Sequence, residues 1–343
     1  MQTQIDFAEP GSAAGWDAYV DDRPDATFFH RRGWSAVLER TFAYRDHSLV
    51  ATRGGEVRGV LPLLLVRNLP TGHSLVSTPF GVYGGIVADE EETARLLLDR
   101  ARECGERLGV RYVELRQTTP IGDLPVKNLY VTFKRPIFPT SDENMAAIPR
   151  NQRRSIRLGF KNGLSSRVGD FDLFDPFYDV YSESVRNLGT PVFPKSLFEN
   201  LLREFGPACR ILGVFHEGRM VAGVMTFLFQ DQVMPYYGGA VRDAFRLSAN
   251  DFMYWSLMIH GMEHGFRVFD FGRSKVDSGS YHFKRHWGFE PTPLPYQFLL
   301  IRQRSIPDLS PRNPKFAAAI RLWQRIPLPV TQWIGPKIIR YFP

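Results

Sequence analysis

The sequence is short of cysteine and of long apolar runs, and both shortages limit what the protein can be. Only two cysteines, Cys104 and Cys209, occur among 343 residues, too few for a disulfide framework or an all-cysteine zinc site. Each lies in an apolar stretch, where a buried thiol in a reducing compartment is the ordinary interpretation. No stretch approaches the roughly 18 apolar residues of a membrane-spanning helix, and residues 1–10 lack the regions of a signal peptide. We therefore expect a cytoplasmic protein.

The motifs of several enzyme classes are also missing. No Gly-x-Ser-x-Gly turn occurs, so a serine hydrolase of that type is not expected. His282 and His286 have the four-residue spacing of two metal ligands on a helix, but no third ligand is evident near them. We therefore expect no metal.

Acidic residues are nearly absent from the C-terminal tail, residues 301–343. Between Arg302 and Pro343 eight basic residues face one acid, Asp308, so the tail accounts for the whole net charge of +7. Tryptophan and isoleucine are interspersed among them. Such a segment can lie on an anionic membrane surface, where each basic residue contributes about 1 kcal/mol. It can equally pack as a strap over the second half of the chain, and the sequence leaves both alternatives open.

The two halves of the chain repeat one another. Gly54-Gly55 lies between the apolar runs 49–52 and 60–66, and Glu217-Gly218 lies between 211–215 and 224–229, so each half predicts a hairpin. The correspondence then continues in the same order: Tyr83-Gly84-Gly85 and Tyr237-Gly238-Gly239, helix-length segments at 91–108 and 250–264, and strands at 110–116 and 266–273. The offset stays between 154 and 164 residues.

This repeat predicts the domain organisation. It is much longer than the repeats of solenoids, which reach about 50 residues, and it fits a duplicated domain. A chain of 343 residues is long enough for about two domains. We expect an α/β (α+β) fold with a first domain at 1–145, a second at 146–300 and the tail at 301–343.

A concentration of basic residues lies between the halves. No acid occurs from Arg150 to Lys161, and the spacing places five cations on one face of a predicted helix: Arg150, Arg153, Arg154, Arg157 and Lys161. Like charges at i,i+4 destabilise a helix, which favours an anionic partner, and arginine binds phosphate well. The alternative is a solvated amphipathic helix.

The segment 269–289 concentrates polar groups after a strand, at a sheet edge where α/β proteins place their sites. Lys284 lies there among aromatic residues. A cation in this setting can stabilise a developing oxyanion or neutralise a phosphate, or it can simply stack on Trp287.

At this point the sequence resembles a known family. Asp270-Phe271-Gly272-Arg273-Ser274, Gly279, Phe283-Lys284 and Trp287-Gly288-Phe289 are similar to the C-terminal signature of the FemAB-like transferases, the peptidoglycan interpeptide-bridge family. Residues 148–164 resemble the basic helix between the two halves of that family. The resemblance covers roughly residues 27–300 and is nearest to the subgroup associated with exosortase and PEP-CTERM systems. It implies two tandem GNAT-like domains, each a mixed sheet flanked by helices.

The resemblance implies acyl transfer from an activated donor, acyl-CoA or aminoacyl-tRNA, to an amine of a cell-envelope or exopolysaccharide precursor, with no tightly bound cofactor. GNAT domains hold the coenzyme A pyrophosphate on a Gly-rich loop that opens a helix. The matching segment here, 242–250, contains no glycine, and its counterpart in the first half, 87–92, is acidic. The first half is therefore expected to be a degenerate scaffold. The tRNA-using members often carry a long helical arm in the second half, and none is evident here.

Residue roles are carried over from the resemblance one at a time. Lys284 matches the Phe-Lys motif and is expected to stabilise the oxyanion or a donor phosphate; because a loop cation contributes little to stability, Lys284→Ala should leave the fold intact. Asp270 is either a base, or a group that orients one, or a structural hydrogen-bond acceptor. The candidates for substrate binding are Tyr237, Arg273, Ser274, Tyr281 and Trp287, and packing in the core is the alternative for Tyr237. tRNA and an anionic membrane are candidate partners and DNA is not, with peripheral placement at the inner membrane. The alternative function is an inactive scaffold of an envelope assembly.

Overall fold

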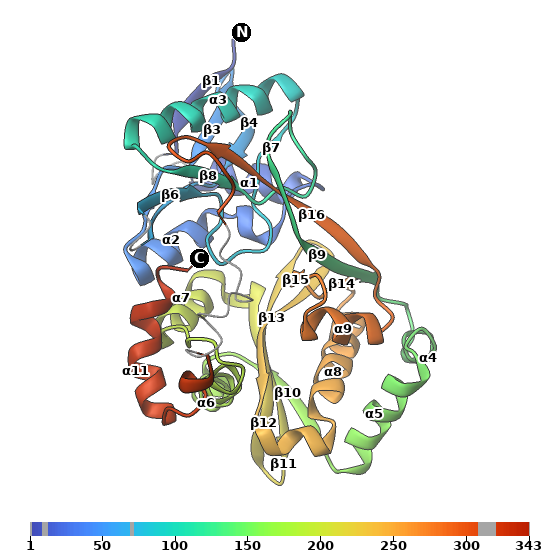
Figure 1. Cartoon of the computed structure of the whole chain (residues 1–343). Helices are drawn as coiled ribbons and strands as arrows, with labels where there is room; N and C mark the ends of the chain where they lie inside the picture. Colours follow the sequence, from blue (N-terminus) through green and yellow to red (C-terminus); the bar gives the residue numbers. More distant parts are fainter. Residues whose placement is uncertain (1, 9–12, 69–71, 308–319, 343) are drawn as a thin grey trace. The chain divides into compact units, whose positions relative to one another are not determined.

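The protein is described by a computed structural model that covers residues 2–8, 13–68, 72–307 and 320–342. Its contacts divide the chain into two compact units (Figure 1). Unit 1 comprises Met1–Tyr130, Pro293–Leu309 and Arg340–Pro343, and unit 2 comprises Val131–Thr292 and Ser310–Ile339. Asp308 and the rest of the tail up to residue 319 lie outside the described residues.

Two strands, β9 (Val126–Pro136) and β16 (Pro291–Leu300), begin in one unit and end in the other. The contact-based boundaries therefore differ from the expected domain boundaries at 145 and 300, which stay a prediction. Strand pairing explains the difference. The end of β9 pairs with β14 (Val268–Asp270), and the end of β16 pairs with β8 (Tyr112–Leu115). Each strand end is therefore assigned to the unit of its pairing partner, which is distant in sequence.

Unit 1 contains two sets of paired strands and three α-helices among the described residues. Its elements are β1 (Gln4–Phe7), α1 (Ala13–Asp22), η2 (Phe28–His30), α2 (Arg32–Phe42), β2 (Arg45–Asp46), β3 (Leu49–Arg53), β4 (Glu56–Leu61), β5 (Leu64–Asn68), β6 (Gly72–Val76), β7 (Val87–Ala88), α3 (Glu91–Leu108) and β8. One strand order is β1-β3-β4-β7, and the other includes β8-β6-β5-β2. Strand β6 runs parallel to β8, and β7 pairs antiparallel with β4.

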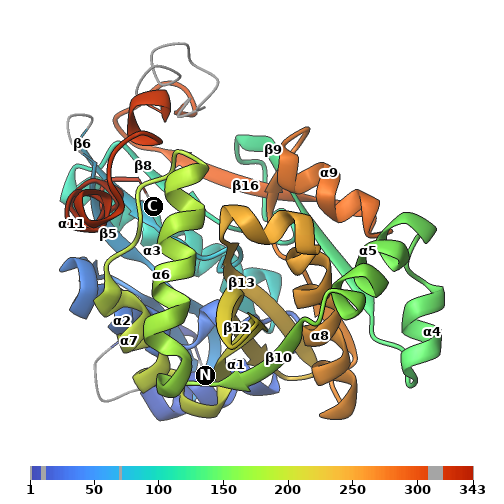
Figure 2. The same cartoon turned by 90° about the horizontal axis from the view of Figure 1, so that it is seen from below.

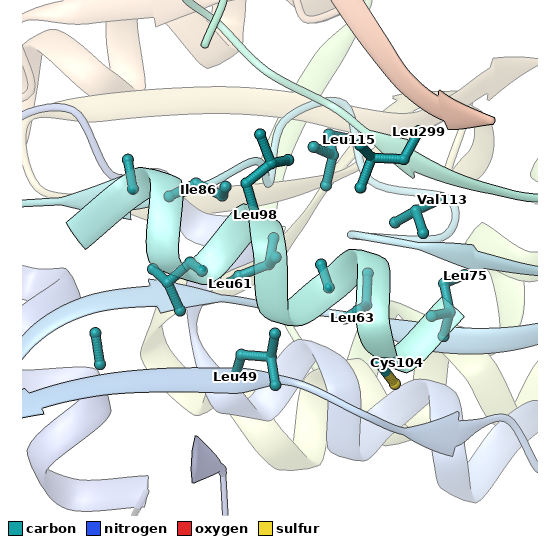
Figure 3. Packing of buried hydrophobic residues seen from close by; sticks show 14 of the residues in the cluster. Leu49, Leu61, Leu63, Leu75, Ile86, Leu98, Cys104, Val113, Leu115 and Leu299 are labelled. Carbon is teal, nitrogen blue, oxygen red and sulfur yellow. The ribbon is translucent and has the colours of Figure 1, made fainter. Parts of the chain in front are cut away.

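The core of unit 1 forms where α3 covers the strands. Leucines and alanines recur along one face of α3 and lie against β3, β4 and β8 (Figure 3). Leu97, Ala101 and Cys104 on this face are almost completely buried. The periodic spacing of these residues is what predicts the helix, and Gly109 ends it in the left-handed conformation that glycine adopts without strain.

Unit 2 repeats this plan with a larger sheet. Its other elements are α4 (Ser141–Ala146), α5 (Arg150–Lys161), β10 (Ser165–Gly169), α6 (Phe171–Asn187), α7 (Lys195–Phe205), η3 (Gly206–Ala208), β11 (Cys209–His216), β12 (Arg219–Phe229), β13 (Gln232–Ala240), η4 (Arg242–Leu247), α8 (Ala249–Glu263), β15 (Ser274–Lys275), α9 (Gly279–His286) and α11 (Leu328–Ile339). Its strand order is β10-β11-β12-β13-β14-β9. Helices α6 and α8 lie on opposite sides of β12 and β13 (Figure 2).

The predicted duplication is confirmed by the order of elements. A hairpin (β3/β4 or β11/β12), a following strand segment, a helix (α3 or α8) and a parallel strand (β8 or β14) occur in each half. One detail differs from the prediction. Tyr237-Gly238-Gly239 lies inside β13, whereas Tyr83-Gly84-Gly85 lies in an irregular segment before β7, because β6 and β7 together take the place of the single strand β13.

The tail forms a strap in the part that the structure describes. Helix α11 packs against α6 (Figure 2), with Thr331 and Ile339 buried. Its other face exposes Trp333, whose ring lies under Lys337 Nζ at 3.7 Å. The packed face fits the strap alternative, and membrane binding by the exposed face stays a prediction. No helix among the described residues is long and apolar enough to span a membrane.

Candidate functional site

The candidate site in unit 2 begins where β13 and β14 separate. These parallel strands pair only through Gln232 with Val268 and Val233 with Phe269, after which β13 continues with β12 alone. The β12–β13 register shifts at the same place, since Met225 pairs with Tyr237 and Thr226 with Pro235. Tyr236 is therefore the extra residue of a β-bulge. A bulge bends a strand and redirects its side chains, and bulges are common beside active sites.

Asp270, at the end of β14, forms the turn that follows the strand. Its carboxylate is fully buried; Oδ1 accepts the Gly272 N–H at 2.7 Å, and Oδ2 lies 3.2 Å from Lys134 Nζ. Buried carboxylates need such partners, because an unpaired buried charge is strongly destabilising. The geometry fits the alternative of a structural acceptor, and a role as base stays a prediction.

Lys284 extends from α9 beneath the same turn. Its ammonium donates to the carbonyl oxygens of Phe271 at 2.7 Å, Gly272 at 3.0 Å and Arg273 at 3.1 Å, which uses all three of its N–H donors. Burial lowers the pKa of Lys284 to about 7, and the nearby Asp270 carboxylate opposes this shift. The lysine therefore holds the backbone of residues 271–273 in place.

This environment corrects one expectation about stability. Lys284 is 8% exposed and has three carbonyl partners, so it is not a loop cation of little structural consequence. Its removal would leave buried carbonyl oxygens without a donor, at a cost of about 3 kcal/mol. The catalytic role assigned to Lys284 stays a prediction, and any direct contact with a reacting oxygen would have to replace one of these three bonds.

The other predicted site residues have different surroundings. Ser274 is buried and its hydroxyl has no hydrogen-bond partner in the part of the chain described, whereas Arg273 is only half-buried. Tyr281 is half-buried in the first turn of α9, with its ring centroid 5.6 Å from that of Phe133. Trp287 is completely buried and donates its N–H to Asp251 at 2.8 Å. A substrate contact by Trp287 would therefore require the surrounding aromatic residues to open.

Tyr237 follows the bulge and lies in an aromatic cluster, defined as Tyr181, Phe193, Phe198, Phe227, Tyr236 and Tyr237. The ring centroids of its neighbours lie 4.8–6.4 Å from that of Tyr237. Its hydroxyl has no hydrogen-bond partner among the described residues, and burial raises the pKa of Tyr237 well above 10. A neutral hydroxyl is thus buried beside the bulge without a partner among the described residues.

The segment that precedes α8 differs from a pyrophosphate-binding loop. It is the 3₁₀ helix η4, without glycine, and the α8 N-cap is Ser248 in a left-handed conformation. Arg242, Arg246 and Phe245 are exposed on it. The segment therefore offers exposed arginine side chains where a Gly-rich loop would offer backbone N–H groups.

The predicted basic helix is present as α5, and the five cations that the sequence places on it all lie within this helix. Arg150, Arg154, Arg157 and Lys161 are exposed and Arg153 is half-buried, and none of the five forms an ion pair with another described residue. Ile156 is buried on the opposite face, where α5 packs against α8. Leu158 and Phe160 are 40% and 55% exposed, so the cationic surface also carries apolar groups.

Sequence reasoning missed several residues of the site. Lys134 and Asp251, the partners of Asp270 and Trp287, lie far away in sequence and give no local signal. The bulge at Tyr236 does have one, because Pro235 stands inside an otherwise regular strand and proline in a central strand indicates a bulge. Among the described residues, no group of three or more His, Cys, Asp or Glu side chains is arranged to hold a metal.

Comparison with known proteins identifies the fold. Residues 148–285 match the family model described as "Acetyltransferase (GNAT) domain". No curated protein matches the sequence. The solved structures that are similar include FemX, with a TM-score of 0.71, 16% identity and coverage of 88% of this chain and 98% of that one. The fold is a tandem GNAT fold.

Two further structures support this assignment. The C-terminal domain of a putative lysylphosphatidylglycerol synthetase from Agrobacterium fabrum has a TM-score of 0.60 and 15% identity, with coverage of 91% of this chain and 94% of that one. A tandem GNAT protein from the clavulanic acid biosynthesis pathway has a TM-score of 0.53 and 12% identity, with coverage of 87% and 97%. The match of residues 148–285 to an acetyltransferase domain supports acyl transfer as the reaction class.

Proposed function

We propose that the protein is an N-acyltransferase that moves an acyl or aminoacyl group to an amine of a cell-envelope or exopolysaccharide precursor, with the reaction in unit 2. The observation that carries this proposal is the separation of β13 from β14 next to the bulge at Tyr236. This opening leaves strand edges beside the buried hydroxyl of Tyr237, which has no hydrogen-bond partner among the described residues, in the domain that matches the acetyltransferase model. Exposed backbone groups at such an edge can bind an acyl carbonyl.

The proposed reaction needs a donor ester or thioester and no oxidant. The acceptor amine attacks the carbonyl carbon, a C–N bond forms, and the C–O or C–S bond breaks. The leaving group takes the electron pair and the proton that the amine gives up. The Tyr237 hydroxyl is suited to donate a hydrogen bond to the leaving atom, because burial keeps it protonated.

Lys284 and Asp270 act in this proposal as positioning residues. Both fix the turn at residues 271–273, Lys284 through three carbonyl oxygens and Asp270 through the Gly272 N–H. A rigid turn at the edge of the opening keeps Arg273, Ser274 and Tyr281 in a constant position for substrate.

The donor that the surface favours is an aminoacyl-tRNA. Helix α5 presents cations that form no ion pair with another residue of the described ranges, and η4 adds Arg242 and Arg246. An extended polyanion neutralises many cations at once, whereas the pyrophosphate of coenzyme A would need the Gly-rich loop that η4 replaces. The similarity to FemX and to a lysylphosphatidylglycerol synthetase domain supports an aminoacyl donor and an envelope acceptor. The exposed Trp333 and Lys337 of α11 would bring the protein to an anionic inner-membrane surface.

The test is binding and transfer with the full chain. We would measure binding of charged tRNA and of acetyl-CoA at several salt concentrations, then transfer of labelled acyl groups to envelope precursors. The variant is Arg154→Gln/Arg157→Gln on α5, and the control is Arg167→Gln/Arg219→Gln on β10 and β12. For a tRNA donor, the α5 variant should lower the salt slope by about 2, one unit per lost cation, and the control should not.

The alternatives make different predictions in the same experiment. Binding of acetyl-CoA with little salt dependence, equal in both variants, would identify an acyl-CoA enzyme. Absence of transfer with either donor would support the inactive scaffold instead. Loss of transfer in Tyr237→Phe with unchanged donor binding would support the chemistry proposed above.

A further inference from the structure

Unit 1 contains a pocket that the proposed function does not use. Its volume is 290 Å³, at the lower end of the range for small-molecule sites. One wall is formed by β7 and the first turn of α3, and the other by residues 117–122 after β8. All the residues that line it belong to unit 1.

The duplication shows which position this pocket occupies. In unit 1, β6 pairs in parallel with β8, but the next strand, β7, pairs with β4 instead. The strand that leads into α3 is therefore separated from β8. In unit 2, β13 leaves β14 in the same way before α8. The pocket of unit 1 therefore corresponds to the opening of unit 2 that we assign to acyl transfer. The first half retains the opening of the fold, although its sequence indicated a degenerate scaffold.

The lining of this pocket does not suit an anion. Four carboxylates line it, Asp25, Asp89, Glu90 and Glu91, and no lysine or arginine among the described residues does. Their arginine partners, which include Arg23, Arg53, Arg58 and Arg95, are not part of the lining. Each of the four carboxylates is thus paired with an arginine, and the pocket presents carboxylate oxygens to a ligand rather than a large net negative charge. An ammonium group can bind these oxygens, whereas a pyrophosphate would meet them without a cation among the described lining residues.

A buried amide supplies the second, independent observation. Gln117 is 3% exposed and lines the pocket, and its Nε2 has no hydrogen-bond partner among the described residues. An unsatisfied buried amide costs about 1–3 kcal/mol. The Gln117 amide also lies close against Gly85, since a Cβ added to Gly85 would be only 2.0 Å from Gln117 Oε1. The glycine allows the amide to rest directly on the backbone.

We propose that this pocket binds a small molecule that carries both an ammonium group and a hydrogen-bond acceptor. The carboxylates of Asp89, Glu90 and Glu91 attract the ammonium, and the Gln117 N–H₂ donates to a hydroxyl or carbonyl oxygen of the ligand. The first half then contributes a ligand site of opposite charge preference to a GNAT donor site. This inference does not depend on the proposed reaction, because it concerns binding to unit 1 alone.

The experiment measures ligand binding to the full chain without any donor. The probes are ethanolamine, serinol and D-glucosamine, each a primary amine with a hydroxyl acceptor, together with their N-acetylated counterparts and inorganic pyrophosphate. Thermal shift and ligand-observed NMR report binding. We expect saturable binding of at least one amine at 50 mM salt, at least ten-fold weaker binding of its acetylated form, and none of pyrophosphate.

The key variant is Gln117→Met, whose matched control is Gln297→Met. Gln297 is equally buried, but its amide is satisfied at both ends by Ile121, at 2.8 and 3.0 Å. Gln117→Met should raise the melting temperature of the free protein and abolish the shift caused by the amine. Gln297→Met should lower the melting temperature. A second pair of variants tests the contribution of the carboxylates. Glu91→Gln should weaken amine binding several-fold, and Glu106→Gln at the far end of α3 should not.

Three outcomes would overturn the proposal. They are the absence of binding by every amine, equal binding of amines and acetylated forms, and amine binding that survives Gln117→Met. Transfer activity plays no part in these readouts, so failure here would leave the proposed acyl transfer untouched.

Discussion

At the residue scale, Lys284 combines burial with a full set of carbonyl partners. We expect Lys284→Met to lower the free energy of unfolding by about 3 kcal/mol at neutral pH, because three buried carbonyl oxygens lose their donor. The pKa of Lys284 is lowered by burial to about 7 from 10.5. Between these pH values the unfolded chain binds the proton that the folded chain lacks, so the stability of the wild type should rise with pH.

Urea unfolding at pH 7 to 10 tests whether stability rises with pH. The difference in stability between the wild type and Lys284→Met should grow with pH, at a slope of up to about 1.4 kcal/mol per unit. Lys195→Met, which removes an exposed lysine paired with Asp175, serves as the control and should not show this slope over the same range. A constant difference would mean that the carbonyl oxygens keep Lys284 charged throughout.

Tyr237 and Tyr178 offer a matched pair of hydroxyl groups in the packing around α6. The Tyr237 hydroxyl has no partner among the described residues, whereas the Tyr178 hydroxyl donates to the Phe193 carbonyl at 3.0 Å. Tyr237→Phe should leave the melting temperature equal or higher and lower the turnover at least ten-fold. Tyr178→Phe should cost about 1 kcal/mol of stability and leave turnover per folded molecule unchanged. Full activity in Tyr237→Phe would remove it from the mechanism.

His30 makes the stability of unit 1 sensitive to acid. Its ring is buried and bonded on both sides, since Nδ1 accepts the Thr27 N–H at 3.0 Å and Nε2 lies 3.1 Å from the Gly85 carbonyl oxygen. Burial lowers the pKa of His30 to about 4 from 6.5. Stability that is present above pH 6.5 should therefore be lost as the pH falls to 4, by up to about 3 kcal/mol. His30→Gln should lack this part of the acid dependence in chemical denaturation, and His73→Gln should retain it.

At the element scale, α5 concentrates charge at a cost to its own stability. Arg157 has three cationic neighbours at i,i+3 or i,i+4, namely Arg153, Arg154 and Lys161. Each such pair destabilises a helix by about 0.2–0.5 kcal/mol. Arg154→Gln/Arg157→Gln should therefore raise the free energy of unfolding by roughly 1 kcal/mol at low salt while it weakens polyanion binding. A stability that is unchanged at low salt would show that solvent already screens these charges.

The elements themselves could be predicted from the sequence, because their causes are local. The bounds of α3 and α5 follow from apolar spacing and from a turn residue or proline at an end, and the structure has them at 91–108 and 150–161. The partners of functional groups could not be predicted. Lys284 meets carbonyl groups eleven to thirteen residues away, Asp270 meets Lys134, and Gln117 rests on Gly85. Such contacts depend on which strands become neighbours, and the local patterns of a sequence do not show that.

At the scale of the whole molecule, helix α11 of the tail has two faces with different surroundings. One face of α11 packs against α6, and the opposite face exposes Trp333. The packed face has no spare room at Gly335, since a Cβ there would lie 2.8 Å from the Val192 backbone nitrogen. A backbone atom cannot move aside as a flexible side chain can, so an added methyl group must displace the helix.

Two substitutions on α11 can therefore separate packing from membrane binding. Gly335→Ala should lower the free energy of unfolding by about 1–3 kcal/mol, and Trp333→Ala should change it by less than about 0.5 kcal/mol, because that side chain is 65% exposed. Co-sedimentation with vesicles that contain phosphatidylglycerol should show the reverse order, with binding reduced in Trp333→Ala and less affected in Gly335→Ala. If neither variant alters sedimentation, the tail is a strap alone, and its positive charge needs another partner. If Gly335→Ala alone abolishes sedimentation, membrane binding requires α11 to be docked on α6, because docking buries the opposite face of α11 and leaves the face with Trp333 exposed.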